Sequence, residues 1–256
     1  MLENSLRTRG VVFAFLFGPP RFVQREDAAR VHGRVCDQLA YDDITFQYST
    51  SSPDAKPSSK GFAIRFERKE GRGVFQAGVE YQGASQPMRL LISHDWPPSL
   101  EHVKEIFDLT TTAVFDALEG PCQRVVAEVR LRAQCDVREQ SGLEFFLQHI
   151  LKPSSGQLTE LGTPLAFGSI RLEVAGGTAE GSSLDRPKRD LTVEVLREDP
   201  RCVYLELVSQ WTQIPSGSQS GGALDLSRVR AIDQKPSAYI EEAHRFLTTK
   251  VVHLGG

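Results

Sequence analysis

The longest regular pattern in the sequence is an alternation of apolar and polar residues from Gln123 to Arg138. The odd positions from Val125 to Val137 are all apolar, and the even positions are polar or charged apart from Val126. Successive side chains of a β-strand point to opposite faces of its sheet. The pattern therefore predicts one long strand with a buried face and a solvated face.

Further elements are predicted on both sides of this strand. Strand patterns occupy 11–17, 44–50, 62–67, 74–81 and 88–93 before it, and 170–174, 191–195 and 202–211 after it. Helical spacing of apolar residues predicts helices at 25–40, 99–118 and 141–151, and a last helix that Ser237 caps. Each half thus reads strand, helix, three or four strands, long helix.

The repeated order predicts an internal duplication. The expected fold is α+β, with two tandem β-α-β-meander-α units that have antiparallel sheets and long helices packed on one face. Gly120 and Pro121 are expected to end a helix and so mark the junction. The predicted units are residues 1–121 and 122–256, or alternatively one intimately packed pseudo-duplicated domain.

Composition and charge narrow the class of protein. The chain has 256 residues, 40% hydrophobic and 25% charged, with a net charge of −3, which is ordinary for a globular protein. Neither half is basic, so broad electrostatic attraction to nucleic acid or membrane is not favoured. The four cysteines form no CxxC pair, which indicates free thiols rather than a zinc site. No run approaches membrane-spanning length, and a cytoplasmic location is expected.

The layout resembles a family of sporadically distributed, uncharacterised prokaryotic proteins. The resemblance rests on Phe17-Gly18-Pro19-Pro20 after the first strand, the helix 100–118 ahead of an Arg-bearing strand at 125–137, and the closing segment 239–246. Where that family commonly has an aromatic-Asn pair, this chain has Ala133-Gln134. The patchy distribution of the family implies a mobile accessory or defence gene, and it implies no catalytic residues.

Four arginines of the central strand form the first candidate binding feature. They share its solvated face and could bind phosphates or an acidic peptide, although Glu128 and Asp136 lie on the same face. Neighbouring strands offer further acids as cross-strand partners. A charge-paired solvated face is therefore the competing interpretation. The candidate residues are Arg124, Arg130, Arg132 and Arg138.

The segment His94-Asp95-Trp96-Pro97-Pro98 is the second candidate feature. An exposed Trp96 beside two prolines could anchor a partner peptide. The alternative is a rigid connection between a strand and the following helix.

Catalytic patterns are weak throughout the sequence. Asp116, Glu128 and Arg130 loosely imitate a nuclease pattern, but arginine replaces the lysine that would assist the attacking water. The six histidines are scattered, and no nucleophile elbow or phosphate-binding loop is present. No catalytic residue, metal ligand or cofactor is therefore assigned.

These observations favour a non-enzymatic binding or assembly subunit of a prokaryotic multiprotein system, such as an antiviral defence system. The expected partners are other proteins or further copies of the chain, with nucleic acid not favoured and no membrane. Two alternatives are a metal-dependent nuclease or hydrolase and a binder of single-stranded nucleic acid.

Overall fold

The structure is a computed structural model. It describes residues 6–18, 23, 25–49, 61–82, 87–120, 122–137, 142, 168–174, 187–195, 201–212 and 235–251. The strands are β1 (Leu6–Gly18), β2 (Asp43–Ser49), β3 (Gly61–Glu70), β4 (Gly73–Tyr81), β5 (Met88–Asp95), β6 (Gln123–Asp136), β7 (Gly168–Val174), β8 (Lys188–Val195) and β9 (Cys202–Thr212). The helices are α1 (Arg25–Gln38), α2 (Leu100–Leu118) and α5 (Pro236–Phe246), followed by a π-helical turn, η5 (Leu247–Val251).

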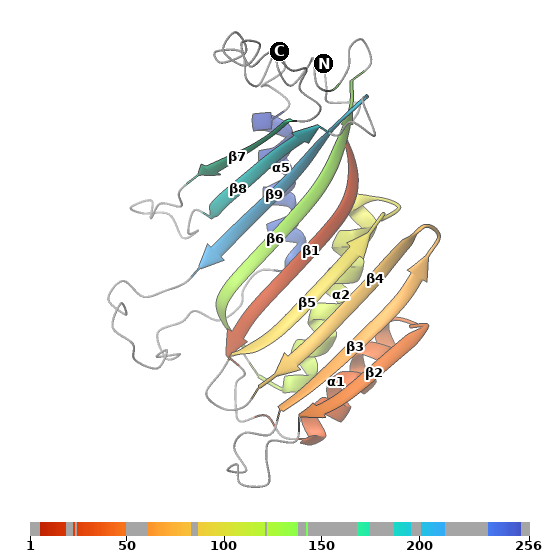
Figure 1. Ribbon diagram of the computed structural model, residues 1–256. Coiled ribbons are helices and arrows are strands. Elements are labelled where there is room, and N and C mark those ends of the chain that lie inside the picture. Colours follow the sequence, from red (N-terminus) through yellow and green to blue (C-terminus); the bar gives the residue numbers. More distant parts are fainter. Residues whose placement is uncertain are drawn as a thin grey trace, which may run out of the picture.

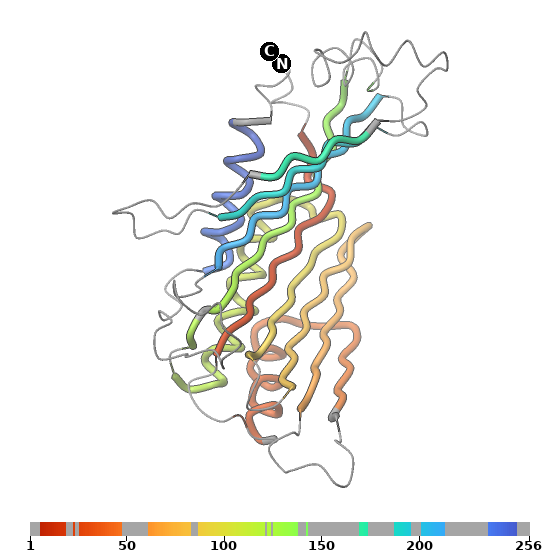
Figure 2. Tube along the Cα trace, turned by 60° about the vertical axis from the view of Figure 1, so that its left-hand side comes forward, coloured from red at the N-terminus to blue at the C-terminus, as the bar shows by residue number. Residues whose placement is uncertain are grey.

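One continuous sheet contains all nine of these strands, in the order β2-β3-β4-β5-β1-β6-β9-β8-β7. Every neighbouring pair is antiparallel. Figure 1 shows α1, α2 and α5 behind the sheet, and Figure 2 shows them along the same side of the twisted strands. The opposite face, called the open face here, carries no described helix.

The predicted architecture of two tandem units with their own sheets is wrong. The strands β1 and β6 pair with each other from Leu6↔Cys135 to Gly18↔Gln123 and so join what was expected to be two sheets. Pairing satisfies the backbone groups that two separate sheet edges would leave open. The described helices have 14, 19 and 11 residues and form one layer through the α1–α2 and α2–α5 contacts, rather than long helices on separate sheets. A division of the chain at residue 121 stays a prediction.

The core lies between the sheet and the helices. The odd residues of β6 point into it, as their apolar character predicts, and Val129 is completely buried. Aromatic residues of β1 supply much of the packing: Phe13 and Phe15 contact Tyr239 of α5, and Phe17 contacts Phe115 of α2. Gln134 belongs to the face that was expected to be solvated, but its side chain is buried beside Cys202.

The helix ends differ in detail from the predicted caps. Ser99 caps α2 as expected, accepting a hydrogen bond from the His102 N–H at 3.0 Å. At the other end Glu119, rather than Gly120, adopts the left-handed conformation, with φ of 55°. Ser237 does not cap α5; instead its own N–H donates to Asp108 Oδ1 of α2 at 2.9 Å. The predicted helix at 141–151 lies outside the described residues except for Gly142.

Candidate functional site

A row of paired residues crosses the open face through Gly10 of β1. This residue pairs with Asp95 of β5 on one side and with Arg132 of β6 on the other. Glu206 of β9 and Thr192 of β8 continue the same row across the sheet. A Cβ atom at Gly10 would lie 3.1 Å from Asp95 Oδ1, so the Asp95 carboxylate packs closely over the glycine.

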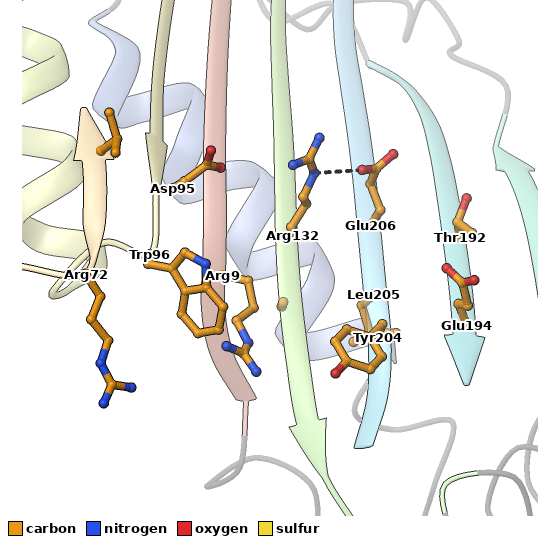
Figure 3. Close-up of a pocket in the computed structure, with 12 residues that line it drawn as sticks. Arg9, Arg72, Asp95, Trp96, Arg132, Thr192, Glu194, Tyr204, Leu205 and Glu206 are labelled. Atoms are coloured by element: carbon orange, nitrogen blue, oxygen red, sulfur yellow. Dashed lines mark hydrogen bonds and ion pairs between the residues drawn. The ribbon is translucent and has the colours of Figure 1, made fainter. Parts of the chain in front are cut away.

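Most of this row lines a pocket of about 650 Å³, called the open-face pocket here (Figure 3). Six neighbouring strands (β4, β5, β1, β6, β9 and β8), the β3–β4 turn and the segment after β5 contribute to it. The lining residues are Arg9, Arg72, Val74, Asp95, Trp96, Arg132, Ala133, Thr192, Glu194, Tyr204, Leu205 and Glu206.

A β-bulge brings Arg9 to the pocket. In the β1–β6 pairing Thr8 opposes Ala133 and Gly10 opposes Arg132, so Arg9 is the extra residue between them. A bulge inserts one residue and redirects its side chain relative to the regular alternation. The guanidinium carbon of Arg9 consequently lies 3.6 Å from the centre of the Trp96 ring. Such a cation–π contact contributes about 0.5–1 kcal/mol at an exposed site.

The backbone of Trp96 is held in an unusual conformation. Its φ is 54°, in the left-handed region, where a residue other than glycine costs about 1–3 kcal/mol. The Trp96 N–H donates a hydrogen bond of 2.8 Å to the carbonyl oxygen of Arg9. Half of the side chain is exposed (50%). The fold therefore holds a large aromatic ring at the surface in a fixed place.

A second hollow of about 630 Å³ lies on the other side of Trp96 and is called the basic hollow here. The described residues that line it include three arginines and no acidic residue. Its lining residues are Arg7, Thr8, Arg9, Arg72, Trp96, Pro97, Pro98, Ser99 and Leu100. Ser99, the N-cap of α2, is one of these lining residues, and the N-terminus of a helix favours negative charge. An anionic group is therefore the chemistry that this hollow suits.

The charges of the two hollows differ. In the open-face pocket Arg132 donates to Glu206 at 3.0 Å, so this arginine is already paired with an acid. Among the residues that the structure describes, Arg7, Arg9 and Arg72 form no ion pair. The uncompensated positive charge of the site thus lies on the side of Trp96 that faces the basic hollow, whereas Asp95 and Glu194 also line the open-face pocket.

Of the four arginines in the predicted stripe, the structure describes the side chains of Arg130 and Arg132. Arg132 lines the open-face pocket, whereas Arg130 lies 3.9 Å from Glu128 on its own strand and does not line it. Arg124 is described only in its backbone, where it pairs with Phe17. Arg138 lies outside the described residues. The charge-paired interpretation therefore fits Arg130 and Arg132.

The fold does not bring together the acidic residues of the loose nuclease pattern. Asp116 is exposed on α2, in the helix layer, whereas Glu128 belongs to the open face with Arg130. The sheet separates the two carboxylates, so they cannot share one metal ion.

Trp96 was a predicted site residue, but Arg7, Arg9 and Arg72 were not. The spacing of these arginines in the sequence gives no sign that they share a site. The bulge and the pairing of β1 with β5 and β6 bring them together in the fold. One signal was available: a glycine directly before an apolar strand often marks a bulge, and Gly10 precedes the run from Val11.

No protein-family model matches the chain, and no curated protein matches it. Among the described helices, none is both long enough and apolar enough to cross a membrane.

Proposed function

We propose that the protein is a non-enzymatic binding or assembly subunit, which docks an acidic segment of a protein partner over Trp96. The observation that carries this proposal is the exposed, left-handed Trp96, which lies between the open-face pocket and the basic hollow.

The residue types around Trp96 support a protein partner. Tryptophan, tyrosine and arginine are the residues in which binding energy at protein interfaces concentrates. The site combines Trp96 and Tyr204 with Arg9 and Arg72. Because Arg9 and the strained backbone already fix the ring, a partner need not pay the full ordering entropy of that side chain.

The charges support an acidic segment. Arg7, Arg9 and Arg72 surround the ring without acidic partners in the described part of the chain, and the basic hollow has no carboxylate in its lining. Complementary charge raises association rates and rejects partners of the wrong sign. An acidic residue next to an apolar one would match the basic hollow and the ring together.

The wider setting is part of the same proposal. The resemblance to sporadically distributed prokaryotic proteins favours a subunit of a multiprotein system, such as an antiviral defence system. Such a subunit needs an exposed anchor, and the half-exposed Trp96 supplies one.

Selection from a library of random peptides displayed on phage tests the proposal. Peptides that bind the wild-type protein should be enriched in Asp and Glu, and synthetic copies should bind in a fluorescence titration. The variants Arg72→Glu and Trp96→Ala should each weaken binding by at least about tenfold, since loss of an anchor costs about 2 kcal/mol or more.

Arg65→Glu is the matched control, because Arg65 lies on the open face with a side chain that is 69% exposed but lines neither hollow. It should bind as the wild type does. Selected peptides without acidic residues, or equal binding by all three variants, would contradict the proposal. So would a single-stranded oligonucleotide that binds more tightly than the peptides, with a steep salt dependence that Arg72→Glu abolishes.

A further inference from the structure

Three side chains capable of binding a metal ion meet at one end of the sheet, on the helix side. Glu70 ends β3, His94 lies near the end of β5, and His102 is in the first turn of α2. Glu70 Oε2 lies 2.9 Å from His94 Nε2 and 2.7 Å from His102 Nε2. The three atoms lie within 4.8 Å of one another.

The hydrogen bond at His94 Nδ1 fixes which ring nitrogen carries the proton in a neutral imidazole. It therefore decides whether Nε2 presents an N–H or a lone pair to the Glu70 carboxylate. His94 Nδ1 lies 3.0 Å from the backbone carbonyl oxygen of Asp95, which can only accept, so Nδ1 carries a proton. In a neutral ring Nε2 then has the lone pair, and it points at the Glu70 oxygen. Two groups that are both acceptors face each other at 2.9 Å, and a cation between them removes the conflict.

We propose that Glu70, His94 and His102 bind a divalent transition-metal ion such as zinc. Two imidazoles and a carboxylate are a frequent ligand set for zinc and iron(II). Ligands about 2.1 Å from a shared ion lie roughly 3.0 to 3.4 Å apart. The two separations from Glu70 Oε2, 2.9 Å and 2.7 Å, are slightly shorter, and all three ligand atoms lie within 4.8 Å of one another. A small rotation of His102, which is 31% exposed, would lengthen its distance from Glu70 to that of two ligands sharing an ion.

The surroundings of the three residues resemble those of metal ligands. The Asp95 carbonyl orients His94, which is the usual outer partner of a metal-bound histidine. Arg68 donates to the other carboxylate oxygen, Oε1, and leaves Oε2 for the ion.

The three ligands are buried to different extents, so one side of the ion would face solvent. The His94 side chain is fully buried and that of Glu70 is 15% exposed, whereas His102 reaches the surface. Three protein ligands with a position open to solvent are the arrangement in which zinc keeps a bound water.

The ion would tie the β3–β4 turn to the segment between β5 and α2. That segment contains Trp96, two residues after His94 and six before His102. Metal binding does not depend on the proposed docking function, because none of its three ligands lines either hollow.

Isothermal titration of the chelator-treated full chain with Zn²⁺ tests the proposal. One ion should bind per chain, and the melting temperature should rise with its concentration, as it does for a ligand that binds only the folded state. His102→Ala and Glu70→Gln should each weaken binding by more than the 10- to 100-fold that loss of an outer partner causes. His32→Ala is the control, since His32 lies on α1 and is no part of the cluster.

A second readout identifies the ligands directly. Co²⁺ bound at this site should give visible absorption bands that His102→Ala changes and His32→Ala leaves unchanged. Absence of Zn²⁺ and Co²⁺ binding would overturn the proposal. Binding that survives both ligand variants, or that only His32→Ala removes, would overturn it as well.

Discussion

Arg9 holds Trp96 from two sides: its guanidinium lies 3.6 Å from the centre of the indole ring, and its carbonyl oxygen accepts the Trp96 N–H at 2.8 Å. Both contacts depend on the β-bulge in β1, which places Arg9 outside the regular register. A strained, exposed aromatic residue that its neighbours over-determine is the kind of local feature that marks functional sites.

The strain at Trp96 can be measured by comparing two substitutions. Trp96→Ala removes the cation–π contact and keeps a non-glycine residue at φ of 54°. Trp96→Gly removes the same contact but also the conformational cost, because glycine adopts positive φ freely. Trp96→Gly should therefore be more stable than Trp96→Ala by about 1 kcal/mol in denaturant unfolding. The reverse order would show that Trp96 is not in this conformation in solution.

The two faces of β6 should respond differently to substitution. Val129→Asp places an unpaired carboxylate in the core, which costs several kcal/mol, about enough to unfold a marginal domain. Arg132→Ala removes a solvent-exposed ion pair with Glu206 and should cost about 0–1 kcal/mol. Thermal melts decide this, and equal losses in both variants would mean that the register of β6 is wrong.

Two glycines should respond to alanine with opposite signs. A Cβ atom at Gly73 would lie 2.3 Å from the carbonyl oxygen of Asp95 and 2.6 Å from that of Trp96, so backbone would have to shift. Gly73→Ala should destabilise the protein and disturb Trp96. Gly33 lies in α1 with nothing within 4 Å, and Gly33→Ala should stabilise by about 0.5–1 kcal/mol. Chemical denaturation of both variants tests this, and a harmless Gly73→Ala would contradict the close approach.

The thiols should differ in reactivity. Burial raises the pKa of Cys122 to about 12 and that of Cys135 to about 11, and both stay protonated at pH 8. Cys202 is also buried, whereas Cys36 is partly exposed. Reaction with Ellman's reagent should therefore modify Cys36 first in the native protein and all four thiols in guanidinium chloride. Rapid modification of Cys122 or Cys135 in the native state would contradict the packing.

Local periodicity predicted the elements well. The alternation around Val129 gave the long strand, and the spacing from Leu100 gave α2, both of which the structure confirms. Periodicity says which face of a strand is buried but not which strand is its neighbour. The pairing of β1 with β6, which merges the expected sheets into one, therefore could not be predicted from either strand alone.

The candidate site was only partly accessible to sequence reasoning. Trp96 stood out because a tryptophan beside two prolines is an unusual local cluster. Arg9 becomes a site residue through a one-residue bulge, and Glu70 meets His94 only through the β3–β4–β5 pairing. Such contacts arise from strand pairing over long sequence separations, which no spacing rule in the chain encodes.

Acrylamide quenching of tryptophan fluorescence tests the docking proposal most directly. The chain has two tryptophans, and Trp211 is only 2% exposed, so quenching in the native protein reports Trp96. Trp96→Phe supplies the background from Trp211. Saturation with a selected acidic peptide should protect Trp96 and reduce quenching to nearly that background. Peptide binding that leaves the quenching of Trp96 unchanged would contradict the account.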